Sequence, residues 1–166
     1  MDRPTLIRPD AFHRPAAETP GVDRREAFAD DHVWAGRSRT EAGTWSGWHV
    51  HPGHDTYVFQ TEGRLRLEFG PGGTQSVEGG PGDFVRIPRG VVHREGNPGT
   101  EPNEAIVFRV GEGEVLVNVD GPESLTLLGP GTVAAMIAAG PSQSGARTSR
   151  SSPKWPTASL AWVIMT

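Results

Sequence analysis

Short runs of alternating apolar and polar residues, separated by glycine and proline, mark most of the chain between residues 33 and 120. The clearest run, Arg-Leu-Arg-Leu-Glu-Phe at 64–69, alternates strictly with period two, which is the pattern of a half-buried β-strand. Strands are expected on this basis at 33–40, 45–51, 56–61, 64–69, 74–77, 83–87, 91–95, 104–110 and 115–120. Short strands at this spacing predict an all-β fold, either a closed or a two-sheet β-barrel.

The two ends of the chain differ from this central region, which we place at 32–123. Residues 1–31 are expected to form an N-terminal arm, with a short strand at 5–8 and one or two helical turns at 23–30. The helical turns are expected because Asp23 is a good N-cap and Glu26 follows three residues later. Residues 124–166 are expected to form a partly flexible C-terminal tail. The alanines favour a short helix at 132–139, and 158–165 is either an added strand or an unstructured end.

Composition and charge narrow the classes of function. All twenty acidic residues lie at or before Glu123, together with thirteen of the sixteen basic ones, so residues 1–123 carry a net charge of −7. This acidic body argues against a nucleic-acid partner, which usually requires a basic stripe. There is no cysteine, so the chain needs no oxidising compartment, and no apolar run approaches a membrane span. We therefore expect a cytoplasmic protein without a membrane or nucleic-acid partner.

Three of the six histidines lie close together in the sequence, at His49, His51 and His54. In a strand, residues two apart point to the same face and stand roughly 6.6 Å apart, so His49 and His51 can converge on one ion. A further histidine, His93, lies in a second dense segment at 82–97. We expect His49, His51 and His93 to bind one metal ion, and His54, in the turn, to be a ligand or pocket residue.

The spacing of these residues resembles the two motifs of the cupin superfamily. The first motif of that family runs Gly, five residues, His-x-His, three or four residues, Glu, six residues, Gly; here it spans Gly43 to Gly63. The second runs Gly, five residues, Pro-x-Gly, two residues, His, three residues, Asn, and it is met at every position between Gly82 and Asn97. The resemblance implies a double-stranded β-helix, or jelly-roll, barrel.

One position departs from the first motif. Thr56 stands where metal-binding cupins have glutamate, and a hydroxyl is a poor ligand for a transition metal. Asp55 fits the shorter spacing of the motif but would face the opposite side of the strand. We therefore expect three histidines and no carboxylate around one divalent transition metal, with iron first and zinc, nickel or manganese as alternatives. Similar three-histidine sites occur in cupin thiol dioxygenases and gentisate-type dioxygenases.

Five further residues are candidates for the chemistry of the site. Glu95 shares the face of His93 and is a candidate general acid or base, a role also open to His54. Arg86 is a candidate clamp for a substrate carboxylate. Trp45 has the same strand parity as the first two histidines, and Trp34 lies on a neighbouring strand, so both are expected to line the pocket.

Three classes of function fit these residues. The first is a three-histidine iron(II) dioxygenase acting on a small, anionic organic substrate, since neutral ligands leave the ion its full charge. The second is a non-redox metal-dependent lyase, isomerase or cyclase, and the third is a non-catalytic cupin that binds a small ligand. A homodimer is also expected, because Tyr57 and Phe59 should face outwards where a partner subunit can cover them.

Overall fold

The computed structural model describes residues 3–123, which form two antiparallel β-sheets with short connections. The strands of the first sheet are β1 (Asp23–Ala29), β2 (Val33–Thr40), β4 (His54–Glu62), β7 (Phe84–Ile87) and β9 (Asn103–Gly111). Those of the second are β3 (His49–Val50), β5 (Leu65–Phe69), β6 (Gln75–Gly79), β8 (His93–Gly96) and β10 (Val117–Asn118). The described helices are two 3-10 turns, η1 (Pro9–Ala11) and η2 (Pro71–Gly73), neither of them long enough to cross a membrane.

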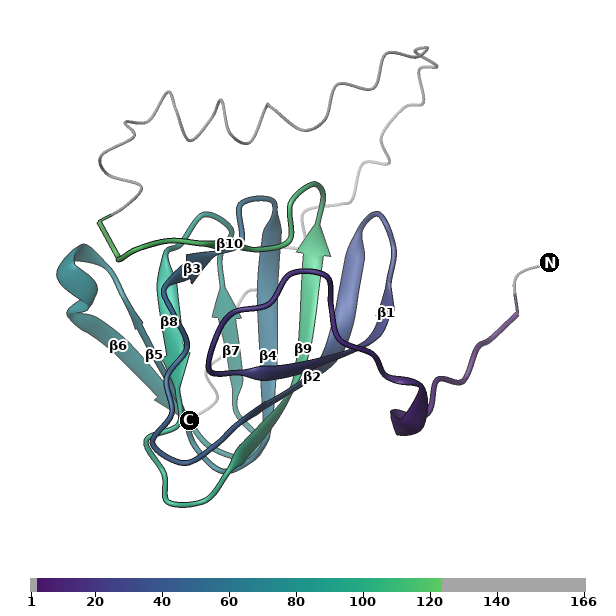
Figure 1. Ribbon diagram of the computed structural model, residues 1–166, viewed down its shortest axis with the longest axis horizontal. Helices are drawn as coiled ribbons and strands as arrows, with labels where there is room; N and C mark the ends of the chain where they lie inside the picture. Colours follow the sequence, from purple (N-terminus) through teal and green to yellow (C-terminus); the bar gives the residue numbers. More distant parts are fainter. Residues whose placement is uncertain (1–2, 124–166) are drawn as a thin grey trace, which may run out of the picture.

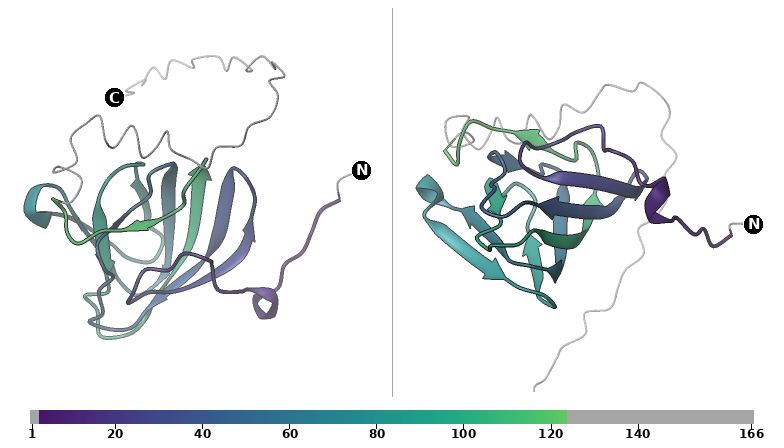
Figure 2. Two further views of the ribbon diagram at one scale, coloured as in Figure 1. Left: turned by 45° about the horizontal axis from the view of Figure 1, so that its top comes forward. Right: turned by 60° about the horizontal axis from the view of Figure 1, so that its bottom comes forward.

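The strand order confirms the predicted two-sheet barrel. The first sheet runs β1-β2-β9-β4-β7 and the second runs β10-β3-β8-β5-β6. The two sheets face one another in Figures 1 and 2, with the loop connections at either end. Consecutive strands lie in different sheets in several places, as in the passage from β4 to β5 and from β7 to β8. This arrangement is that of a jelly roll.

Alternation along the strands creates the interior of the barrel. In β4, His54, Thr56, Val58 and Gln60 are buried while Tyr57 is exposed, as period-two geometry requires. The apolar core is formed by residues from both sheets, namely Trp34, Val58, Leu65, Leu67, Ile87, Ala105 and Val107. This core fills one part of the interior, and buried polar side chains fill the rest.

The helical turns expected at 23–30 are absent, and the expectation was wrong. Residues 23–29 form strand β1, which pairs antiparallel with β2 at the edge of the first sheet. A register shift between Glu26 and Phe28 interrupts the pairing. The edge of β2 offers backbone hydrogen bonds along its whole length, and this pairing outweighs a local capping signal. The strand expected at 5–8 is also absent, and a 3-10 turn at Pro9–Ala11 follows that segment.

The strand expected at 45–51 is shorter than predicted. Only His49–Val50 pair regularly, while Trp45 makes a single isolated bridge to Gly96 of β8. The indole of Trp45 covers Gly96 so closely that a Cβ atom there would lie 2.3 Å from the ring. Trp45 therefore packs this loop onto β8. The expectations for the C-terminal tail concern residues 124–166, which lie outside the described residues.

Candidate metal centre

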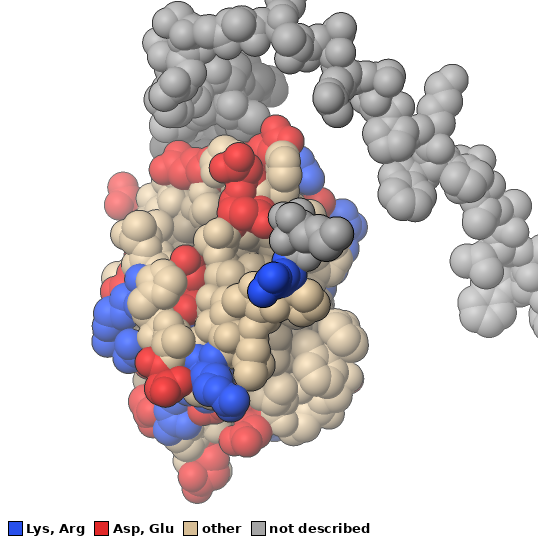
Figure 3. Space-filling view, turned by 90° about the vertical axis from the view of Figure 1, so that its right-hand side faces the viewer, with Lys and Arg blue, Asp and Glu red and all other residues tan. Residues whose placement is uncertain are grey.

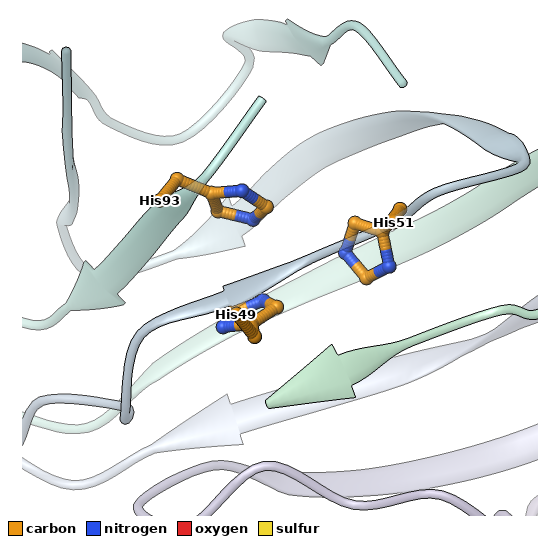
Figure 4. A group of neighbouring side chains, drawn as sticks. All are labelled: His49, His51 and His93. Carbon is orange, nitrogen blue, oxygen red and sulfur yellow. The ribbon is translucent and has the colours of Figure 1, made fainter. Parts of the chain in front are cut away.

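Three histidine side chains converge inside the barrel, as the sequence predicted. His49 belongs to β3 and lies directly opposite His93 of β8 in the strand register, and His51 follows two residues after His49. Their exposed fractions are 0%, 2% and 1% for His49, His51 and His93. Figure 4 shows the three rings gathered around a common space between the two strands. One ligand nitrogen from each ring lies within 4.8 Å of those of the others.

Backbone carbonyls fix the orientation of all three rings. The Nδ1 atoms of His49, His51 and His93 lie 3.0, 2.6 and 2.9 Å from the carbonyl oxygens of Gly47, Val115 and Val91. A carbonyl only accepts, so each Nδ1 carries the proton and donates it. Each Nε2 atom is therefore left with a lone pair, which is the form that binds a metal.

The electrostatic environment keeps the rings of His51 and His93 neutral. Burial, followed by the neighbouring His49, lowers the pKa of His93 to about 4. Burial, followed by Arg109 and the other two histidines, also lowers the pKa of His51 well below its usual value. The Nε2 atoms of His49 and His93 are buried without a hydrogen-bond partner. Such an arrangement is costly unless a cation occupies the space between the rings, so the residues fit a metal ion.

A carboxylate lies beside the histidines. Glu95 places Oε2 at 3.3 Å from Nε2 of His49 and at 3.7 Å from Nε2 of His93. Its other oxygen accepts a hydrogen bond from the buried guanidinium of Arg24, on β1. Burial raises the pKa of Glu95, but Arg24 and His49 outweigh that effect and bring it well below its usual value. Glu95 is therefore ionised near neutral pH.

A narrow cavity of about 30 Å³ extends from the histidines into the barrel. Arg109, Thr56 and Gln60 contribute polar atoms to its wall, and the Nε of Arg109, Oγ1 of Thr56 and Oε1 of Gln60 are buried without hydrogen-bond partners. Arg109 stacks over the ring of Trp34, with its guanidinium carbon 4.4 Å from the ring centroid. Burial and then Arg24 lower the pKa of Arg109 to about 9, so it remains cationic at neutral pH. The cavity thus holds a charged donor without a bound acceptor.

Comparison with known proteins identifies a domain family within the chain. A family model described as "Cupin domain" matches residues 36–109, which span β2 to most of β9. Residues 36–109 are a cupin domain. No curated protein matches the sequence.

Solved structures agree with this cupin fold at low sequence identity. A Klebsiella pneumoniae protein with a double-stranded β-helix domain has a TM-score of 0.57 at 17% identity, covering 70% of this chain and 98% of its own. KdgF from a Halomonas species has a TM-score of 0.51 at 18% identity, and the alignment covers 64% of this chain and 94% of KdgF. Oxalate decarboxylase from Bacillus subtilis has a TM-score of 0.53 at 20% identity, but only 34% of that longer chain is covered against 75% of this one. These similarities concern the fold.

Of the other residues expected at the cupin site, only Glu95 reaches the cavity. Arg86 points away from the barrel, with a side chain 57% exposed and 3.4 Å from Asp55. Trp45 lies against Gly96 and Arg94, outside the cavity wall. Trp34 belongs to the apolar core and donates its indole N–H to Glu26, so it reaches the cavity only through Arg109.

His54 is buried but separate from the three-histidine group. Its Nδ1 lies 3.3 Å from the carbonyl oxygen of Glu114, and it is neither in the metal-ligand cluster nor in the wall of the cavity. Burial lowers its pKa. Thr56 faces inwards, as expected for the position of the missing family glutamate.

Sequence reasoning missed the two buried arginines. Arg109 has the same strand parity as Ala105 and Val107, which face the interior. Both faces of the strand at 104–110 are largely apolar in sequence, so an alternation of polar and apolar residues does not show which face is buried. Arg24 was missed because its segment was expected to be helical. Within a strand, its parity would have pointed it inwards.

We predict that the metal-free protein loses stability as the pH falls from about 7 to about 4. The pKa of His93 is about 4 in the folded state against a usual value of 6.5, so over this range the unfolded chain binds a proton that the folded chain does not. Through this residue the free energy of unfolding falls by roughly 3 kcal/mol, because each pKa unit corresponds to about 1.4 kcal/mol. Urea unfolding of the wild type at several pH values measures it. His93→Gln should show a smaller pH dependence, and an equal dependence in the variant would contradict the assignment.

Proposed function

We propose that this protein is a metal-dependent enzyme acting on a small anionic organic substrate, with an iron(II) dioxygenase as the first candidate. The observation that carries the proposal is the combination of three convergent histidine Nε2 atoms with a buried arginine that has no hydrogen-bond acceptor in the same cavity. Perturbed and unsatisfied groups that meet in a cavity are typical of a catalytic site. A purely structural core would have no reason to retain them.

His49, His51 and His93 would hold the ion. Imidazole nitrogens suit iron, nickel, zinc and copper, so the ligand set favours a divalent transition metal without selecting one. When bound, iron(II) would supply redox chemistry with dioxygen as well as a Lewis acid for a substrate oxygen. The hydrogen bonds of the three Nδ1 atoms to carbonyls keep the rings in place before the ion arrives.

Arg109 would anchor the anionic group of the substrate. With neutral histidines, the charged groups of the cavity are Arg24, Arg109 and Glu95, which leave one positive charge in excess. A carboxylate can accept two parallel hydrogen bonds from a guanidinium, and burial strengthens such a pair. Thr56 lies opposite Arg109 in the strand register, so its hydroxyl can donate to the same group. The small cavity restricts the substrate to a compact acid.

Glu95 favours a second candidate, a non-redox metal-dependent lyase, isomerase or cyclase. Its ionised carboxylate lies beside the ligand nitrogens and can accept a proton from a substrate held there. Oxalate decarboxylase of Bacillus subtilis, whose fold is similar, has Mn(II) centres, which suggests manganese as a further metal to test. A cupin that binds the acid without converting it is the remaining alternative.

We predict that protein loaded anaerobically binds about one metal ion per chain and that His51→Ala loses it. Removing one of three neutral ligands takes away a third of the protein's hold on the ion, while the apolar core is untouched. Elemental analysis after desalting measures the content, and oxygen uptake with a panel of small carboxylic acids then separates the dioxygenase from the non-redox candidates. His32→Ala is the matched control, because it removes a histidine whose side chain is 68% exposed and should leave the metal content unchanged. Wild-type protein that retains no iron, manganese, nickel or zinc would refute the proposal.

We predict that Arg109→Met weakens the binding of a small carboxylic acid from this panel by at least tenfold and leaves the metal content unchanged. A buried charge-assisted pair contributes more than a neutral hydrogen bond, and the methionine keeps the apolar stem. Titration calorimetry with the acid and its neutral amide measures the difference, because the amide should bind both proteins alike. Arg86→Gln removes an exposed arginine and is the control; an effect there as large as at Arg109 would restore Arg86 as the clamp.

We also propose a homodimer formed through the outer face of the first sheet. Phe84, Tyr57, Phe108 and Val110 expose 77%, 38%, 42% and 44% of their surface there, on the adjacent strands β7, β4 and β9. An apolar patch of this kind is usually covered by a partner, and an isologous contact is the commonest form. In contrast, the face drawn in Figure 3 carries acidic and basic side chains close together.

Light scattering should accordingly give about twice the chain mass of 17.8 kDa. Phe84→Glu places a charge at the most exposed residue of the patch and should shift the protein to the monomer. Val77→Glu, a comparable change at a 43% exposed valine of β6 in the other sheet, should leave the dimer intact. A wild-type monomer at tens of micromolar, on the order of the concentration at which weak interfaces form, would argue against the interface.

A further inference from the structure

The carboxylate that the first cupin motif normally supplies is missing from this chain. Thr56 occupies that position, and its Oγ1 atom is buried in the cavity wall without a hydrogen-bond partner. A hydroxyl cannot neutralise a divalent ion as a carboxylate does. A cation at the histidines would therefore lack the negative ligand from β4.

Glu95 brings a carboxylate close to two of the same histidines from a different strand. It lies on β8, two residues after His93 and on the same face, so the strand presents a His-x-Glu pair to the interior. Its Oε2 atom is 3.3 Å from Nε2 of His49 and 3.7 Å from Nε2 of His93. The side chain is 14% exposed, which leaves it little freedom to turn towards solvent.

These contacts join atoms that repel one another in the absence of a cation. The Nδ1 atoms of His49 and His93 donate their protons to carbonyls, so each Nε2 presents a lone pair, and the carboxylate of Glu95, paired with Arg24, presents another. Two ligands bound tetrahedrally at about 2.1 Å from one ion are roughly 3.4 Å apart, and octahedral neighbours are closer, at about 3.0 Å. The separation from Oε2 to Nε2 of His49 lies within this range, and the separation to Nε2 of His93 lies slightly above it.

We propose that Glu95 is a fourth ligand of the metal, so that the centre consists of three histidines and one glutamate drawn from the second motif instead of the first. This inference rests on the metal-dependent function proposed above and changes the expected ligand set. Arg24 is the positioning residue: it holds Oε1 and leaves Oε2 directed at the nitrogens. One negative ligand reduces the net charge of a divalent centre from two to one.

Cobalt(II) absorption tests the ligand set, because the visible bands of the ion respond to the number and kind of its ligands. Glu95→Gln should lower the cobalt affinity at least tenfold, measured by competition with a chelator, and should shift the bands. Glu68→Gln is the matched control: Glu68 is 13% exposed and pairs with Arg94 at 2.7 Å, outside the cavity wall. It should match the wild type in both measurements, as should Thr56→Ala.

Glu95→Asp keeps the carboxylate for the case in which glutamine opposite Arg24 prevents folding. It withdraws the oxygen by one methylene, so it should fold, bind cobalt more weakly and change the bands. If both Glu95 variants keep the affinity and bands of the wild type while His51→Ala loses the metal, Glu95 is no ligand and the three-histidine centre stands. If the wild type binds no cobalt, or His51→Ala binds it equally well, both this proposal and the metal-dependent function are wrong.

Discussion

Three hydrogen bonds from imidazole Nδ1 atoms to backbone carbonyls determine what this barrel can bind. They place the proton of His49, His51 and His93 on the outer nitrogen of each ring and aim the other nitrogen at one point. Two of the acceptors lie two residues before their own histidine, in the approach to β3 and β8, so local backbone geometry orients those rings. The third, the carbonyl of Val115, belongs to the segment after β9, and it ties His51 to a distant part of the chain. Burial then keeps the rings of His51 and His93 neutral.

The polar interior follows from this arrangement. Neutral rings provide no negative charge, so the charges of the cavity come from Arg24, Arg109 and Glu95. Arg24 and Glu95 satisfy one another across the two sheets, whereas Arg109 has the ring of Trp34 as its neighbour. Burying a guanidinium without a hydrogen-bond acceptor costs free energy. A buried arginine of this kind is typical of a site where a ligand supplies the acceptor. The interior thus combines a group of nitrogens that could hold a cation with a guanidinium that could hold an anion in the same cavity.

Sequence reasoning was most accurate where spacing alone decides the outcome. Two histidines two residues apart share a face in any strand, and the motif that contains His93 sets its register opposite His49, so the ligand set was predictable. Period-two alternation likewise placed Thr56 inwards and Tyr57 outwards. Residues whose position depends on strand pairing far along the chain were less predictable. Arg24 was expected in helical turns, and Arg86, a candidate clamp with an exposed position as the alternative, pairs with Asp55 outside the barrel. Arg109 gave no signal, because both faces of β9 are largely apolar in sequence.

The position of β1 matters for anyone who would reduce this protein to its domain. The match to the family begins at residue 36, whereas Arg24 lies twelve residues earlier, on a strand that the family pattern does not cover. A fragment trimmed to that match would keep His49, His51, His93 and Glu95 but lose the cation that balances the glutamate. The carboxylate would then face the imidazoles without a counter-charge, and the site would titrate and bind ions differently although its ligands were unchanged. A recombinant fragment or a chimera of this barrel should therefore begin before Asp23 if its ion-binding behaviour is to represent that of the whole chain.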